Sequence, residues 1–116
     1  MSATRILLTN LPRLLTGVVR GLVAQDTELQ IVGDVSIGDV AEAVDATHAN
    51  VVAVGVTDTQ DVIGLTMLRE RHPRLRFLMI DVTGHHATMD EPDGGRRQVT
   101  EISPAALLAM LRGAPG

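Results

Sequence analysis

Short, mainly apolar runs alternate with amphipathic segments along the chain, and this alternation constrains the fold more than any other sequence feature. Residues 4–9, 51–56 and 75–82 are runs of strand length, as expected of strands covered on both faces. Between such runs, apolar residues recur at intervals of three and four, which is typical of helices with one buried stripe. A strand–helix repeat of roughly 20 to 25 residues implies right-handed crossovers and a parallel sheet with helices on both faces.

The remaining elements follow from composition and from residues typical of helix ends. Ser36 and Ser103 are predicted to cap helices, while Pro12 fits a first helical turn and Pro73 ends a helix. The further predicted strands are residues 29–35 and 97–102, the latter at a sheet edge, and the predicted helices are residues 11–25, 37–44, 61–72 and 103–113. Leu14 is assigned to the buried stripe of the first helix.

Five such strands predict a flavodoxin-like three-layer α/β sandwich with a parallel sheet in the order 2-1-3-4-5. In this fold the ligand crevice lies beyond the carboxyl ends of the first and third strands. Residues 83–98 interrupt the alternation, because they contain three glycines, a proline and adjacent histidines without apolar periodicity. We therefore expect a loop with at most one helical turn where a fourth packed helix would normally stand.

Length, charge and residue types exclude several classes of function. The 116 residues suit one domain, assigned to residues 1–113 with a tail at 114–116. A net charge of −4 opposes direct binding to nucleic acid. Cys and Lys do not occur, and no apolar run approaches the ~20 residues of a membrane span. A cytoplasmic protein without thiol or lysine chemistry is expected, and no cofactor is predicted.

Several segments of scaffold type carry a resemblance to a known family. They are 6-ILLTNLPRLLTGVVRGL-22, 31-IVGDV-35, 50-NVVAVGV-56, 71-RHPRLRFLMI-80 and 103-SPAALLAMLR-112. Together they resemble the response-regulator receiver domain found at the N-terminus of LuxR/NarL-type regulators. The resemblance covers nearly the whole chain and implies the flavodoxin-like fold.

The resemblance also implies where the family's phosphorylation site would lie. Active receivers carry an acidic pair after the first strand, a phosphoaccepting Asp after the third, a Thr or Ser after the fourth and a Lys after the fifth. These roles fall in turn on Thr9, Asn10 or Leu11, on Gly55, on Asp81 and on about Thr100. None of these positions carries the family's residue.

These changes remove the requirements of phosphoryl transfer. Aspartyl phosphorylation needs a carboxylate nucleophile and a divalent cation, and Gly55 supplies no nucleophile. Asp81 adds a negative charge where phosphoryl oxygens would enter. The sequence therefore predicts a phosphorylation-independent, non-enzymatic regulatory module of bacterial signal transduction.

A ligand-binding sensor is the alternative function. Its crevice would lie around Asn10, Gly55, Thr57 and Asp81, where the missing side chain of Gly55 would open space. Thr57 and Asp58 are also candidate ligand or metal residues, because hard cations favour oxygen ligands.

Two sets of residues suggest a metal site, and each has a plainer interpretation. Asp58 and Asp61 could join Asp81 around a cation, but they equally suit the start of a helix. The second set is His85, His86, Asp90 and Glu91, which a zinc ion could use. Adjacent histidines in a glycine-rich loop are more often solvated, so neither set is predicted to bind metal.

Protein partners are the expected targets of such a module. Related receivers pair with themselves, with histidine kinases, or with regulators and output proteins, and a homodimer is favoured here. Candidate interface residues are Arg20, Leu108, Met110 and Arg112, on the first and last predicted helices.

Overall fold

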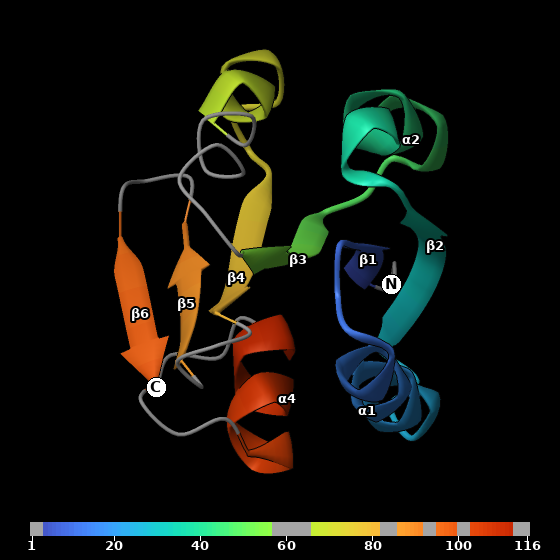
Figure 1. The fold of residues 1–116 in the computed structure, drawn as a ribbon, viewed down its shortest axis with the longest axis vertical. Coiled ribbons are helices and arrows are strands. Elements are labelled where there is room, and N and C mark those ends of the chain that lie inside the picture. Colours follow the sequence, from blue (N-terminus) through green and yellow to red (C-terminus); the bar gives the residue numbers. More distant parts are fainter. Residues whose placement is uncertain (1–3, 57–65, 82–85, 92–94, 100–102, 113–116) are drawn as a thin grey trace.

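One six-stranded sheet organises the protein, which is presented as a computed structural model (Figure 1). The structure describes residues 4–56, 66–81, 86–91, 95–99 and 103–112. The strands are β1 (Thr4–Thr9), β2 (Leu29–Val35), β3 (Val51–Val56), β4 (Arg76–Asp81), β5 (His86–Asp90) and β6 (Arg96–Val99). The helices are α1 (Arg13–Ala24), the 3₁₀ turn η1 (Ile37–Asp39), α2 (Val40–Thr47), residues 66–71 and α4 (Pro104–Arg112).

Four parallel strands form the part of the sheet that the sequence predicted. The strand order is β2-β1-β3-β4-β5-β6, so the predicted order 2-1-3-4-5 is observed. The fifth place is taken by β5, however, and not by the predicted strand 97–102, which corresponds to β6. β1 pairs in parallel with both β2 and β3, and β3 pairs in parallel with β4. Consecutive residues of β1 and β3 are buried, as uninterrupted apolar runs require.

The segment after β4 differs from its prediction as a loop. His86–Asp90 forms β5, which pairs antiparallel with β4 and with β6. Ala87 and Met89 are fully buried, while their neighbours in β5 are partly exposed. This period of two is the pattern of a half-buried strand, but two apolar residues among glycines and histidines gave too weak a signal to predict it. The predicted edge strand corresponds to β6.

Helices cover both faces of the sheet and complete three layers (Figure 1). On one face, α1 and α4 pack on a core that includes Ile6, Leu78 and Met89. On the other face, α2 and the helix at 66–71 pack on a second core that includes Leu7 and Phe77. The alternation of Ile6 and Leu7 between the two cores explains why the central strand β1 has no polar face.

Helix ends agree only in part with the predicted caps. Ser103 caps α4, because its Oγ accepts a hydrogen bond of 3.2 Å from the amide of Ala106. Ser36 does not cap α2, since the turn η1 lies between Ser36 and the first helical residue, Val40. Pro12 lies immediately before α1 rather than within its first turn.

An arginine joins the antiparallel extension to the rest of the fold. Arg76 of β4 makes two hydrogen bonds to the Glu91 carboxylate, Nε to Oε2 at 2.8 Å and Nη2 to Oε1 at 2.9 Å. Its Nη2 also donates to the carbonyl of Met110 in α4, at 3.1 Å. Such bidentate pairs hold two planar groups in one orientation, so Arg76 fixes β5 and α4 together.

Candidate functional site

The predicted site residues meet where the parallel strands end. Thr9 of β1 lies opposite Val54 of β3, and Val56 of β3 lies opposite Asp81 of β4. Asn10, which follows β1, therefore reaches the position of Gly55. The structure thus brings Asn10, Gly55 and Asp81 to one edge of the sheet, as the sequence predicted.

The main chain of Asn10 fills the place of the missing side chain at Gly55. Asn10 has a positive φ of 55°, and its Nδ2 donates a hydrogen bond of 2.8 Å to the Gly55 carbonyl. A Cβ built on Gly55 would overlap the Asn10 carbonyl oxygen and lie 3.3 Å from the Leu11 Cα. A side chain at position 55 therefore requires the β1–α1 connection to move.

This contact changes the interpretation of Gly55. The space that a ligand was expected to use beside Gly55 is occupied by the Asn10 carbonyl group. The sequence did contain a signal for this contact, namely a glycine at the end of a buried strand. Such glycines often mark the close approach of another backbone segment. Asn10 was a second signal, since Asn adopts positive φ more readily than most residues.

Thr9 lies beneath this contact rather than in an open crevice. Its side chain is fully buried, and its Oγ1 has no hydrogen-bond partner. Among the described residues at the carboxyl ends of β1, β3 and β4, Asp81 is the one that carries a carboxylate, and it is partly buried. The described side chains at these three strand ends thus offer an amide, a buried hydroxyl and one acid, which is unlike a cage for Mg²⁺.

The predicted metal sites are only partly covered by the structure. Thr57, Asp58, Asp61, His85 and Thr100 lie outside the described residues. The acids of the second set, Asp90 and Glu91, make ion pairs with arginines. Within the ranges that the structure describes, no three His, Asp or Glu side chains gather as metal ligands would.

The predicted interface residues have different surroundings. Met110 was predicted to lie at an interface, but it is 4% exposed and belongs to the core beneath α4. Its place in the apolar stripe of a short helix explains the burial. Leu108 is partly buried against the same core, and Arg20 is exposed in an ion pair with Asp34 at 3.7 Å. The side chain of Arg112 lies outside the described part of the chain.

α1 presents an apolar surface that the sequence analysis missed. Leu14 was assigned to the buried stripe, yet its side chain is 80% exposed. Leu14, Gly17, Val18 and Gly21 share a helical face. A shallow hollow of about 550 Å³ is lined by the first three of them and by Arg13. A Cβ on Gly17 or Gly21 would meet no atom within 4 Å. The four residues Leu14, Gly17, Val18 and Gly21 form what is called the α1 surface below.

Comparison with known proteins gives this chain no family. No family model matches the sequence, and no curated protein matches it. Over the ranges described, no helix has the length and apolar character needed to cross a membrane.

Proposed function

We propose that this protein is a receiver-like regulatory module that recognises protein partners without being phosphorylated, in bacterial signal transduction. The observation that carries the proposal is the Asn10 main chain, which occupies the space that a phosphoaccepting side chain would need at Gly55. The Asn10 main chain thus closes the site beside Gly55, and the site also lacks a nucleophile.

The chemistry around Gly55 supports the same proposal. A phosphoaccepting carboxylate must project from the strand end toward a bound cation, whereas at Gly55 the amide of Asn10 is hydrogen-bonded to the main-chain carbonyl. Restoring an aspartate at position 55 would not rebuild this arrangement, because the new Cβ would overlap the Asn10 carbonyl. Recognition rather than reaction is the function that remains.

The α1 surface suits a second copy of the chain as partner. In an antiparallel α1–α1 pair, Leu14 of one copy would pack into the open position at Gly21 of the other, and the reverse. Gly17, near the centre of the pair, would let the two helices approach closely. Arg20 is already paired with Asp34 of its own chain, which reduces charge repulsion between the two copies.

Acetyl phosphate with Mg²⁺ tests the phosphorylation-independent function. Intact mass spectrometry is expected to show unmodified protein, and beryllium fluoride is expected to leave the amide NMR spectrum unchanged. The Gly55→Asp variant tests the steric part of the argument and is also expected to remain unmodified, because Asn10 occupies the space. Stoichiometric phosphorylation of either protein would overturn the proposal.

A further inference from the structure

β6 is the outermost strand of the sheet on the side of the antiparallel extension (Figure 1). It pairs with β5 from Arg96, which lies opposite Asp90, to Val99, which lies opposite Ala87. Among the described residues, no strand pairs with its other edge. An edge strand presents main-chain donors and acceptors to which another extended segment can add. The residues whose main-chain groups point outward therefore decide what this edge can bind.

The hydrogen-bond pattern of the extension determines which residues of β6 point outward. In an antiparallel pair, opposite residues that exchange hydrogen bonds alternate with opposite residues that do not. The amide of Glu91 donates a hydrogen bond of 2.8 Å to the carbonyl of Gly95, and the register of β5 and β6, continued by one residue, places these two opposite one another. Counted from this pair, Arg97 bonds to β5. The N–H and C=O groups of Arg96 and Gln98 therefore point away from β5.

The two residues that point outward are also accessible. Arg96 and Gln98 are exposed, and the side chain of Arg96 is 72% exposed. Each supplies one N–H donor and one C=O acceptor to the edge. A strand added in regular register would place two of its own residues, two positions apart, directly opposite Arg96 and Gln98. The edge thus suits a short extended segment.

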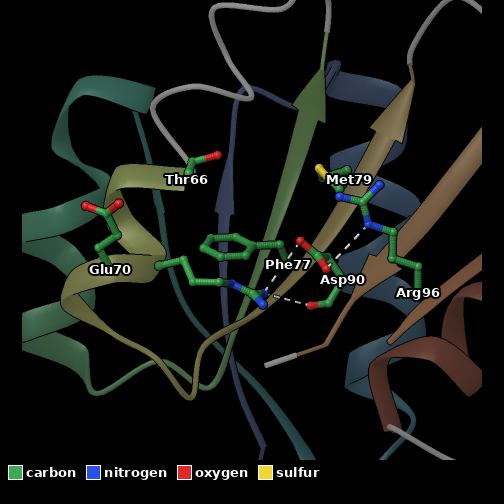
Figure 2. A pocket seen from close by; sticks show the side chains of 7 residues that line it. Thr66, Glu70, Phe77, Met79, Asp90 and Arg96 are labelled. Carbon is green, nitrogen blue, oxygen red and sulfur yellow. Dashed lines mark hydrogen bonds and ion pairs between the residues drawn. The ribbon is translucent and has the colours of Figure 1, made fainter. Parts of the chain in front are cut away.

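The charge of β6 indicates the chemistry of that segment. The whole chain has a net charge of −4, yet β6 has the sequence RRQV and contains no acid. Arg96 pairs with Asp90 at 3.8 Å, and Asp90 also pairs with Arg69 at 3.8 Å (Figure 2). One carboxylate is therefore shared by two guanidinium groups. Because an exposed pair at this distance is weak, Arg96 can attract a second carboxylate placed opposite it on an added strand.

We propose that the exposed edge of β6 binds an extended acidic segment of a partner protein, which adds to the sheet as a further strand. The main chain of the segment exchanges hydrogen bonds with Arg96 and Gln98, and an Asp or Glu of the segment lies opposite Arg96. Pairing of β6 with a second β6 is disfavoured, because it would bring four arginines into one short ladder. The inference rests on the proposed function, since it names the kind of protein partner that the module recognises.

A capped peptide of seven residues tests this edge, with glutamate at its centre and threonine at the other positions. Titration into the ¹⁵N-labelled full chain is expected to give saturable amide shifts at Arg96 and Gln98. The same peptide with lysine at its centre should bind at least tenfold more weakly, because its charge is repelled. An N-methyl group on the glutamate amide should have a similar effect, because it removes the donor that faces the Arg96 carbonyl. Equal binding of either control peptide, or no saturable shift, would overturn the proposal.

Two variants test the charge and the main-chain contact separately. Arg96→Glu should reverse the preference, so that the lysine peptide binds more tightly than the glutamate peptide. Gln98→Pro removes an outward N–H, which an edge strand tolerates, and should weaken binding of the glutamate peptide about tenfold. Arg13→Glu on α1 is the matched control for charge and should keep the original preference. Amide spectra of the free variants show whether each is folded, and unchanged binding in a folded Arg96→Glu or Gln98→Pro protein contradicts the inference.

These titrations also separate this inference from the proposed function. They use unmodified protein, without acetyl phosphate or Mg²⁺. Stoichiometric phosphorylation would overturn the proposed function even where the peptide binds. Absence of peptide binding by a protein that acetyl phosphate leaves unmodified would overturn the β6 inference alone.

Discussion

At the residue scale, the contact between Asn10 and Gly55 involves main-chain atoms as well as the Asn10 amide. A side chain can be replaced without moving its neighbours, whereas a backbone carbonyl can move only with its whole connection. Gly55 therefore does more than leave position 55 without a nucleophile. The β1–α1 connection has taken a path that depends on glycine there.

Replacement of Gly55 by alanine is expected to destabilise the protein by about 3 kcal/mol, because the added methyl group overlaps the Asn10 carbonyl. Urea denaturation followed by circular dichroism measures the change in free energy of unfolding. Gly38→Ala is the matched control, since a Cβ at Gly38 would meet no atom within 4 Å. Equal stability of the two variants would contradict the close contact at Gly55.

At the scale of elements, the antiparallel pair β5–β6 occupies the part of the chain where the family resemblance implies a helix. The pair is attached through side chains on both of its faces. Ala87 and Met89 extend the core beneath α4, while Asp90 and Glu91 are held by Arg69 and Arg76. The extension is therefore part of the packed fold.

Met89→Ala tests whether β5 belongs to the core. Because Met89 is fully buried, its truncation is expected to cost about 3 kcal/mol of stability, measured by thermal or urea denaturation. Thr88→Ala, in the same strand but on the polar face, should cost less than about 1 kcal/mol. A loop at this position would give similarly small effects for both variants.

At the scale of the whole molecule, the sheet separates two surfaces with different chemistry. The α1 surface is mainly apolar and lies on the face of α1 and α4. The surface beside the helix at 66–71, where Arg69 and Arg96 pair with Asp90, is charged and lies on the face of α2. The dimer proposed through α1 would leave this charged surface exposed.

Leu14→Asp is expected to convert the proposed dimer into a monomer, because it places a charge in the apolar contact with Gly21 of the other copy. Sedimentation equilibrium measures the molecular mass in solution. Stability should change by no more than about 0.5 kcal/mol, since Leu14 is 80% exposed. Met67→Asp is the control, because Met67 is 65% exposed on another helix. A monomeric parent protein, or equal dissociation by both variants, would contradict the α1 pair.

The local pattern of the sequence determined the parallel part of the fold. The bounds predicted for β1, β2 and β3 are those observed. For β1 and β3 the reason is that an uninterrupted apolar run of strand length can be buried on both faces inside such a sheet. The absence of a carboxylate at Gly55 was equally plain from the sequence. In both cases the information lies in consecutive residues or in one residue type.

Tertiary structure alone decided the features that depend on residues far apart in the chain. Only the folded chain shows that Asn10 fills the space at Gly55, that Met89 is buried, and that Arg69 meets Asp90. The exposure of Leu14 is a similar case, since helical periodicity does not say where a neighbouring element ends. These contacts arise from the register of strands and the paths of connections, which short-range patterns do not encode.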